Sequence, residues 1–206
     1  MNKTSLLIAD DHKIVRMGLK ALFSAEKDFV VIGEADDGKD AVKKAVSLQP
    51  DVIIMDLMMP AIDGVEATAT IKAKVPSTKI IILTSYYTSD MISKALGEGA
   101  EGALLKTTDD AALLSAIRNV MRGQKYISPD IQSLIAKDPP VSPLTSRQEE
   151  VLHSLVRGLT NKDIARQLDI SEQRVEQHIK VLFEKLGAAN RAEAVAIALR
   201  KHLLKI

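Results

Sequence analysis

The sequence of 206 residues contains no cysteine. Disulfide bonds and zinc sites built from thiolates are therefore excluded. No apolar run approaches the roughly 20 residues of a membrane span, so no membrane partner is expected. The start of the chain leads directly into a short apolar stretch and lacks the long apolar region of a signal peptide. These absences predict a cytoplasmic protein.

Net charge is also nearly absent, at +1, but it is unevenly distributed along the chain. Residues 1–122 hold 15 basic and 17 acidic side chains, whereas residues 142–206 hold 11 basic and 8 acidic ones. The basic bias of the carboxyl-terminal part fits a polyanionic partner, although it would not indicate one by itself.

Short apolar runs alternate with amphipathic stretches over the first 122 residues. Strands are expected near 5–9, 29–33, 52–55, 79–83 and 102–105. Helices are expected near 13–25, 38–48, 64–74, 89–98 and 109–121. Five such repeats predict an α/β fold with a doubly wound, five-stranded parallel sheet.

The alternation stops after Gly123, and only helical patterns follow. Residues 124–141 are rich in proline and predict a semi-stiff linker with a short helix near 129–136. Further helices are expected near 146–157, 161–168, 172–186 and 191–202. The chain is thus predicted to hold a first domain at 1–123, a linker at 124–141 and a small all-α domain at 142–206.

Polar side chains stand where the expected strands end. Asp56 follows the apolar run 52–55, Asp10 and Asp11 follow 6–9, Thr84 follows 80–83, and Lys106 follows 103–105. The carboxyl ends of parallel strands meet at one edge of a sheet, where ligands bind. The acids would repel one another unless a cation intervened, and Mg²⁺ bridges carboxylates and phosphate oxygens. The set predicts a carboxylate, Asp56, that accepts a phosphoryl group.

A simpler interpretation exists for each of these residues. An acid at a strand end is usually only solvated, and Met58 and Met59 are equally explained as apolar cover. Asp63 is more readily explained as a turn former than as a ligand. Tyr86 and Tyr87 either gate the site or simply pack, and the sequence does not decide between these roles.

Residues 4–122 resemble the flavodoxin-like receiver domain of two-component response regulators. The resemblance rests on Ala9-Asp10-Asp11, the segment from Asp56 to Gly64, Leu83-Thr84-Ser85, Gly99 to Gly102, and Leu105-Lys106. It implies that a partner sensor histidine kinase phosphorylates Asp56. It also implies that Asp11, Asp56 and the backbone carbonyl of Met58 bind Mg²⁺, that Asp10 acts through water, and that Thr84 and Lys106 contact the phosphate.

Ala103 departs from this family pattern, because members often carry an aromatic residue three positions before the lysine. In the family this aromatic residue swings inward on phosphorylation and forms a two-residue switch. Without it, the phosphorylation signal would be relayed by Thr84, the 86–98 segment or Tyr87. An atypical regulator, governed by protein contacts instead of phosphate, therefore remains a second hypothesis. A third is a Mg²⁺-dependent phosphatase or phosphotransferase that uses an aspartyl intermediate, although such enzymes usually carry an acid two residues after the nucleophile, where this chain has Met58.

Residues 142–205 resemble the LuxR-type helix-turn-helix domain of the NarL/FixJ family. The motifs are Leu144 to Leu152, Gly158 to Ala165, Leu168 to Ser171, Val175 to His178, Lys185 to Gly187, and Asn190 to Val195. The family resemblance implies a homodimer on activation that regulates transcription from double-stranded promoter DNA. It also implies phosphate contacts or local structural roles for Thr160, Asn161, Lys162, Arg174, His178, Lys185 and Arg191.

The expected helix 172–186 supports this interpretation independently. Its apolar residues form one stripe, and the opposite face carries Gln173, Glu176, Gln177, Lys180 and Glu184. In a recognition helix, Gln177 can read adenine, Lys180 guanine, and Glu176 cytosine. Arg174 and Glu176 depart from the family's common threonine and basic residue, so we expect a distinct target and modest affinity. Without the family pattern, a merely solvated face would be the preferred interpretation.

Overall fold

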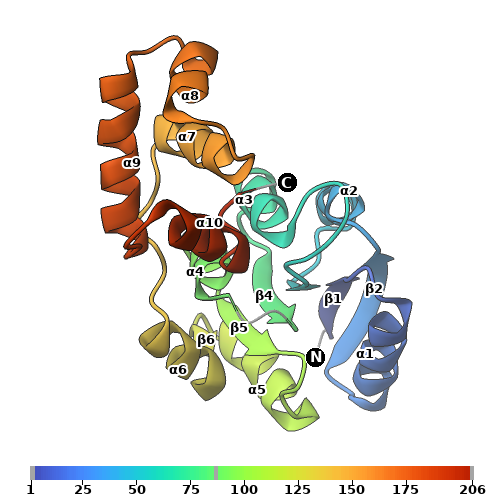
Figure 1. Ribbon diagram of the computed structural model, residues 1–206. Coiled ribbons are helices and arrows are strands. Elements are labelled where there is room, and N and C mark those ends of the chain that lie inside the picture. The colour runs from blue at the N-terminus through green and yellow to red at the C-terminus, as the bar shows by residue number, and fades with distance from the viewer. Residues whose placement is uncertain (1–2, 86–87, 205–206) are drawn as a thin grey trace. The chain divides into compact units, whose positions relative to one another are not determined.

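A computed structural model of the chain describes residues 3–85 and 88–204. Contacts divide the chain into two compact units, Met1–Asp138 and Pro139–Ile206. The first combines a sheet with helices and the second is helical (Figure 1). The α/β architecture followed by an all-α unit is therefore confirmed.

The first unit is built on one parallel sheet with the strand order β2-β1-β3-β4-β5-β6. The strands are β1 (Thr4–Ala9), β2 (Phe29–Ala35), β3 (Val52–Met55), β4 (Lys79–Thr84), β5 (Gly102–Leu105) and β6 (Tyr126–Ile127). The prediction of five strands was wrong by one. β6 is only two residues long, so it carries no strand periodicity that a sequence could reveal.

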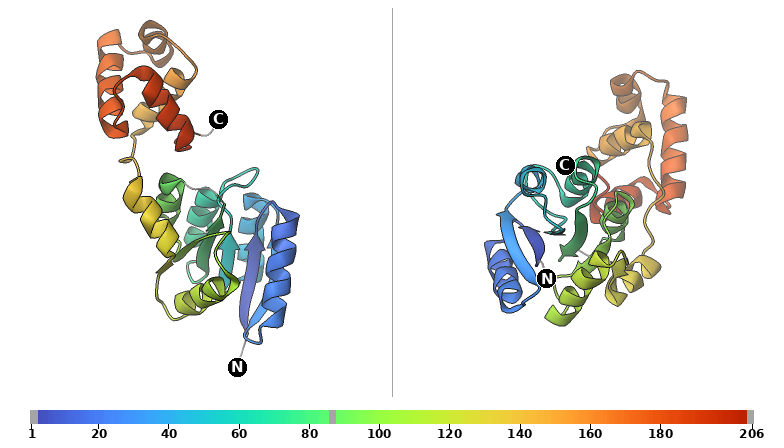
Figure 2. Two further views of the ribbon diagram at one scale, coloured as in Figure 1. Left: turned by 60° about the horizontal axis from the view of Figure 1, so that its bottom comes forward. Right: turned by 180° about the vertical axis from the view of Figure 1, so that it is seen from behind.

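Helices cover both faces of this sheet, as two views show (Figure 2). They are α1 (Lys13–Ala25), α2 (Gly38–Leu48), α3 (Gly64–Lys74), α4 (Ser89–Gly97), α5 (Asp110–Met121) and α6 (Pro129–Lys137). One core lies between the sheet and α1 with α5, and the other lies between the sheet and α2, α3, α4 and α6. Because both faces are covered, β3 is buried along its whole length, as its unbroken apolar run predicts.

Much of the segment predicted as a linker is folded onto the first unit. The backbone N–H of Ser128 donates to the carbonyl of Ala103 in β5, at 3.0 Å. The Ser128 hydroxyl then caps α6 by accepting from the N–H of Ile131. Ile131 is fully buried in the core beside β5. The short helix expected near 129–136 is confirmed, and the first unit extends to Asp138.

Over residues 139–204, the described part of the second unit, the helices are α7 (Ser146–Val156), α8 (Asn161–Leu168), α9 (Glu172–Leu186) and α10 (Arg191–Arg200). Thr145 and Gln148 form the capping box that their spacing predicts at the start of α7. Likewise, the Asn190 side chain accepts from the N–H of Glu193 at the start of α10. All four helices contribute to one apolar core, which includes the α9 residues Val175, Leu182 and Leu186.

Candidate functional site

Two acids and a lysine meet at the carboxyl ends of three strands of the sheet. Asp10 follows β1, Asp56 follows β3, and Lys106 follows β5. The Nζ atom of Lys106 lies 2.6 Å from Asp10 Oδ2 and 2.8 Å from Asp56 Oδ2. The N–H of Asp56 donates to the carbonyl of Ala9, which extends the β1–β3 pairing to this point. The ammonium group therefore joins two carboxylates that the sheet brings together.

Burial sets the electrostatics of this group. Asp56 is only 3% exposed. Burial raises the pKa of Asp56 above its usual value, and the hydrogen bond and charge of Lys106 partly offset that effect. Burial also opposes the charge on Lys106, but its hydrogen bonds to Asp10 and Asp56 prevail and raise the pKa of the ammonium group. The pair thus combines an ammonium group whose charge the two carboxylates stabilise with a carboxylate that burial makes costly to ionise.

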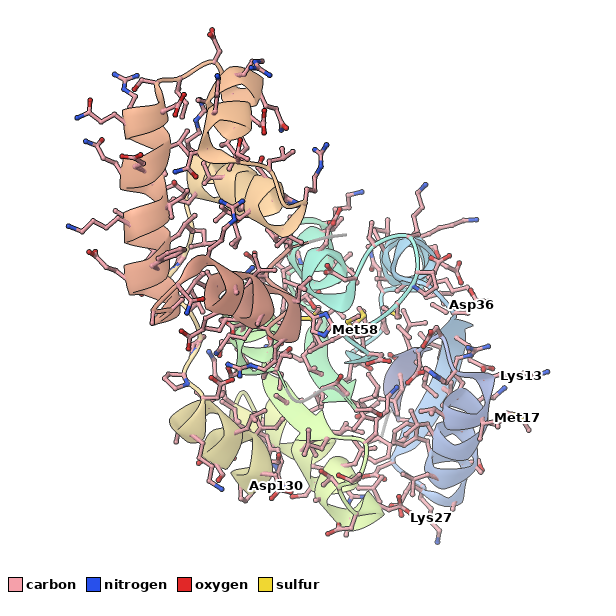
Figure 3. The ribbon with its side chains drawn as sticks, viewed as in Figure 1. Lys13, Met17, Lys27, Asp36, Met58 and Asp130 are labelled. Atoms are coloured by element: carbon pink, nitrogen blue, oxygen red, sulfur yellow. The ribbon has the colours of Figure 1, made fainter. Side chains whose placement is uncertain are left out.

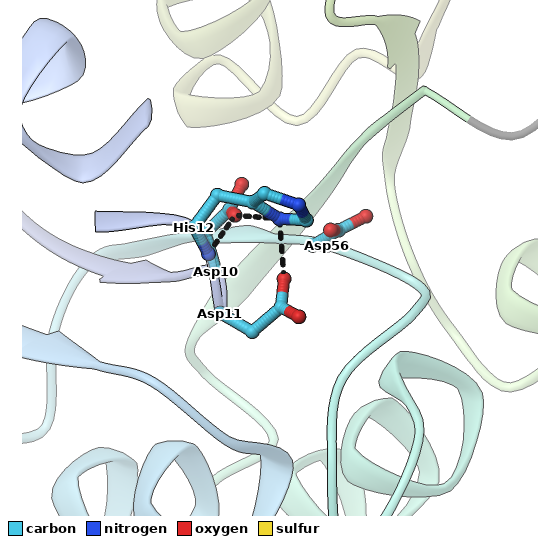
Figure 4. Close-up of side chains that lie close together, drawn as sticks. All are labelled: Asp10, Asp11, His12 and Asp56. Atoms are coloured by element: carbon cyan, nitrogen blue, oxygen red, sulfur yellow. Dashed lines mark hydrogen bonds and ion pairs between the residues drawn. The ribbon is translucent and has the colours of Figure 1, made fainter. Parts of the chain in front are cut away.

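Asp11 and His12 complete a cluster with Asp10 and Asp56 (Figure 4). One possible ligand atom of each residue lies within 4.8 Å of those of the other three. His12 Nδ1 lies 2.6 Å from Asp11 Oδ1, and the His12 side chain is 68% exposed. Carboxylate oxygens are the ligands that a hard divalent cation prefers, so the donor set fits Mg²⁺.

His12 was not predicted as part of the site, although it directly follows the two acids. Its backbone N–H donates to Asp10 Oδ1 at 2.9 Å, which orients that carboxylate. The position after Asp10-Asp11 at a strand end was the signal that could have identified it.

Thr84 lies at the end of β4, and Met58 lies two residues after Asp56 in the chain. Thr84 ends β4, is fully buried, and its carbonyl accepts from the N–H of Lys106 at 2.9 Å. Met58 lies in the loop that follows Asp56 (Figure 3). The Leu57 N–H in that loop donates to Asp56 Oδ1 at 2.7 Å. A phosphate contact by Thr84 and a metal contact by the Met58 carbonyl stay predictions.

The loop after Asp56 is packed too tightly for a side chain at Gly64. A Cβ atom at Gly64 would lie 2.1 Å from the backbone oxygen of Asp56. The Gly64 N–H donates to the carbonyl of Leu57, which folds the loop back onto β3. The Asp63 side chain accepts from the N–H of Glu66 and caps α3, as expected of a turn former. The glycine therefore lets α3 start directly beside the carboxylate.

Ala103, the departure from the family pattern, is fully buried in β5, three residues before Lys106. It pairs with Ile82 of β4 and with Ile127 of β6. Tyr86 and Tyr87, whose roles the sequence left open, lie outside the described residues.

The polar face expected for the second unit is present on α9. Gln173, Glu176, Gln177, Lys180 and Glu184 are all exposed there, and so is Arg174. His178 is partly buried. Lys162 is exposed at the start of α8, next to a partly buried Asn161.

Two basic residues predicted near DNA have internal partners instead of free ammonium or guanidinium groups. Lys185 donates to the carbonyl of Pro143 at 2.6 Å and to the Gln148 side chain at 2.9 Å. Arg191 donates to the carbonyl of Leu159. The sequence allowed either a local structural role or a phosphate contact for these residues. The structure shows the local hydrogen bonds. A phosphate contact stays a prediction.

Comparison with known proteins identifies both units. Residues 6–118 match the response regulator receiver domain. Residues 142–198 match the luxR family of bacterial regulatory proteins. This chain belongs to the LuxR-type transcriptional response regulators. The prediction of a non-enzyme is thereby confirmed, and the phosphatase hypothesis was wrong, because the family consists of DNA-binding transcription regulators.

Similar proteins share this organisation over nearly their whole length. The transcriptional regulatory protein YdfI of Bacillus subtilis (strain 168) is 40% identical, with 100% of this chain and 99% of that protein covered. LiaR of the same strain is 39% identical, with 97% and 98% covered. RcsB of Salmonella enterica serovar Typhimurium, solved bound to a promoter with the phosphomimetic BeF3-, is 28% identical. Its TM-score is 0.72, with 97% of this chain and 99% of that one covered.

In the part of this regulator that the structure describes, we find no helix long and apolar enough to cross a membrane.

Proposed function

We propose that Mg²⁺-dependent phosphorylation of Asp56 by a partner sensor histidine kinase switches this regulator. The observation that carries the proposal is the Asp56 carboxylate, buried at a strand end and held 2.8 Å from Lys106. Asp10 and Asp11 lie beside it within the cluster that can hold a cation. The switch would operate in the cytoplasm, where the promoter lies.

The transfer would make one bond and break one. A carboxylate oxygen of Asp56 bonds to the phosphorus as the bond from phosphorus to the kinase's histidine nitrogen breaks. That nitrogen takes up a proton, and Asp56 becomes an acyl phosphate. Lys106 would move its ammonium from Asp56 to a phosphoryl oxygen, and the Thr84 hydroxyl would bind another.

Asp11, Asp56 and the Met58 carbonyl would hold Mg²⁺, with Asp10 acting through water. Bound there, the cation neutralises carboxylate and phosphoryl charge that would otherwise repel. None of the predicted residues Asp10, Asp11, Asp56, Thr84 and Lys106 is a strong general base, which suits a group that accepts a phosphoryl and holds it.

The second unit would read the promoter through α9. Gln177 would read adenine, Lys180 guanine and Glu176 cytosine. These side chains are exposed on one face, opposite the buried stripe that attaches α9 to its unit. Arg174 and Glu176 replace residues common in the family, which supports a distinct target sequence.

Activation would pair two copies, since two linked modules bind two half-sites more tightly than one. The α1 helix supports this step, because Ile14 and Met17 are 84% and 60% exposed. They lie three residues apart and so occupy one side of the helix, from which Met17 projects outward (Figure 3). Burial of this apolar surface in a homodimer would offset the entropy cost of bringing two chains together.

Sedimentation with Mg²⁺, before and after addition of beryllofluoride, tests the proposal. We expect the phosphoryl mimic to convert monomers into dimers and to increase DNA binding. Asp56→Asn should abolish both effects, and Met17→Asp should abolish dimerisation without preventing the mimic from binding. Asp130→Asn, a change at an exposed position of α6, is the matched control and should behave as the unmodified chain.

The opposite result would favour the atypical regulator. The fully buried Ala103 is the observation that keeps this second function under consideration. If the unmodified chain and Asp56→Asn dimerise and bind DNA alike with and without beryllofluoride, the phosphorylation switch is wrong.

A further inference from the structure

We propose that Arg16 is a positioning residue of the cation site, because it holds the loop that carries Asp10 and Asp11. The inference rests on the proposed function, since it concerns the Mg²⁺ that phosphorylation of Asp56 would need. Arg16 lies on the second turn of α1, and its side chain is only 14% exposed. Its Nη1 atom donates to the backbone carbonyl of Asp10 at 2.7 Å.

This carbonyl determines where Asp11 points. The peptide group that joins Asp10 to Asp11 is planar, so a carbonyl held in one direction also holds the start of Asp11. The Asp11 carboxylate contacts His12 Nδ1 at 2.6 Å, but that imidazole is itself 68% exposed. A solvent-exposed side chain is a weak anchor. The direction of Asp11 therefore depends on its backbone, and Arg16 is the charged donor to that backbone.

Asp10 is held from several sides, and Arg16 supplies the contact to α1. The Asp10 N–H donates to the carbonyl of Ala35 at 3.1 Å. Its carboxylate accepts from the His12 N–H at 2.9 Å and lies 2.6 Å from Lys106 Nζ. With the bond from Arg16, the backbone and carboxylate of Asp10 are both fixed. The loop is thereby arranged before any cation arrives.

Glu34 keeps the guanidinium group in place. Arg16 Nε lies 3.5 Å from Glu34 Oε2, a contact between opposite charges. The other oxygen of Glu34 lies 2.5 Å from Lys20 Nζ. Glu34 precedes Ala35 at the end of β2. Arg16 thus connects α1 and the end of β2 to the loop, and a planar guanidinium can serve both partners at once.

The consequence concerns affinity for the cation. Mg²⁺ demands near-octahedral geometry, so a loop that is free to move binds it less well. Residues that orient metal ligands typically change metal affinity by about 10- to 100-fold. We therefore expect loss of the Arg16 contact to weaken Mg²⁺ binding by at least about tenfold.

Calorimetric titration of the full chain with Mg²⁺ tests this role through four variants. Arg16→Met removes the donor, Arg16→Lys keeps a charge and one possible donor, and Glu34→Gln removes the charge that holds the guanidinium. Lys20→Met is the matched control, because Lys20 also lies on α1 and contacts Glu34 but has no contact with Asp10 among those the structure describes. The melting temperature of each metal-free variant is measured in parallel.

If Arg16 acted only through its charge, its removal would strengthen Mg²⁺ binding, whereas loss of a positioning residue weakens it. Removal of a cation near acids strengthens Mg²⁺ binding, so Lys20→Met should bind as tightly as the unmodified chain or slightly more tightly. Arg16→Met should bind at least about tenfold more weakly with little change in melting temperature, and Arg16→Lys should recover part of the loss. Glu34→Gln should also show a loss, but removal of an acid weakens Mg²⁺ binding by charge alone. If Arg16→Met does not fold, Arg16→Lys therefore decides the question, because it keeps the charge and changes only the geometry of the donor.

Three results would overturn the assignment. The first is Mg²⁺ affinity in Arg16→Met within about twofold of the unmodified chain. The second is a loss of affinity that follows the melting temperature across all variants, which would make Arg16 a structural residue only. The third is absence of Mg²⁺ binding by the unmodified chain, which would overturn the proposed function together with this inference.

Discussion

At the scale of single residues, the site is governed by two carboxylates that share one ammonium group. Lys106 lies within hydrogen-bonding distance of both Asp10 and Asp56. Burial raises the pKa of Asp56, and the negative charge of Asp10 raises it further, because one ammonium group does not fully compensate two carboxylates. The residual negative charge is what a divalent cation would neutralise.

The raised pKa has a consequence for stability that can be measured. A carboxyl group with a higher pKa in the folded than in the unfolded state stabilises the fold only below its unfolded pKa. That contribution is lost as the pH rises through the folded value. At neutral pH the buried charge on Asp56 therefore opposes folding. We expect Asp56→Asn to raise the denaturant midpoint of the metal-free protein at neutral pH.

The gain in denaturant midpoint should disappear as the pH falls toward 3.8, the ordinary pKa of an aspartate. Near that pH the buried Asp56 carboxyl is protonated, so it is as neutral as the asparagine that replaces it. Asp36→Asn, at an exposed position, should show neither the gain nor its loss. An Asp56→Asn protein that is less stable than the unmodified chain at neutral pH would contradict the argument.

Gly64 gives a second prediction at this scale. A methyl group there would lie 2.1 Å from the Asp56 backbone oxygen, so Gly64→Ala must displace the loop or the end of β3. We expect a loss of roughly 3 kcal/mol in the free energy of unfolding, near the upper end for overpacking. Binding of beryllofluoride should weaken with it.

Gly97→Ala is the control for this change. Apart from its chain neighbours and the backbone of its own helix, no described atom lies within 4 Å of a Cβ at Gly97, and the residue is helical. Alanine there should stabilise the protein by up to about 1 kcal/mol. Equal effects of the two substitutions in chemical unfolding would show that the close approach at Gly64 is unimportant.

At the scale of elements, β6 and α6 are the additions that the sequence did not fully reveal. β6 pairs with β5, and α6 packs against β5 and α4. They cover Ala103 and the side of β5 that does not pair with β4. The short strand and the helix therefore belong to the receiver core.

Ile131 tests this view of α6. It is fully buried beside β5, so Ile131→Ala should lower the free energy of unfolding of the first unit by about 3 kcal/mol. Ser133→Ala, at an exposed position of the same helix, should change it by less than about 0.5 kcal/mol. Chemical unfolding measures both variants, and equal small effects would mean that α6 is not part of the folded unit.

The α9 helix carries the corresponding prediction for the second unit. Glu176 is exposed on the polar face, where an acid repels DNA phosphates. Glu176→Lys should therefore strengthen DNA binding and steepen its dependence on salt concentration, by a slope of roughly one for each phosphate gained. A titration of DNA affinity at several salt concentrations measures this.

Glu149→Lys changes the net charge equally but lies at an exposed position of α7. It should leave the slope nearly unchanged. If both substitutions steepen the slope alike, Glu176 does not face the DNA.

At the scale of the whole molecule, the chain has separate hydrophobic cores. Two clusters lie on the two faces of the sheet within Met1–Asp138, and a third lies within Pro139–Ile206. No residue belongs to clusters of both units, among those the structure describes. Each unit thus has its own basis for cooperative unfolding.

Calorimetry of the full chain should accordingly show two transitions. A ligand stabilises only the unit that binds it, so Mg²⁺ with beryllofluoride should raise the melting temperature of the first unit alone. The shift should be absent in Asp56→Asn. A single transition that shifts as a whole would contradict independent unfolding.

The elements and acids that the sequence predicted are those with local signals. The unbroken apolar run of β3, the stripe of α9 and the capping box of α7 follow from periodicities and spacings within a few residues. Asp56, Asp10 and Lys106 could be grouped in advance because parallel strands end at one edge. The family resemblance then supplied the roles.

What only the tertiary structure decided depends on contacts between distant residues. The two residues of β6 form a strand because β5 offers an open edge. Lys106 reaches two carboxylates at once because three strand ends converge. Lys185 points inward because Pro143, which lies far from it in the sequence, accepts its hydrogen bond. Such contacts leave no periodic pattern, since they depend on where separate segments meet when the core packs.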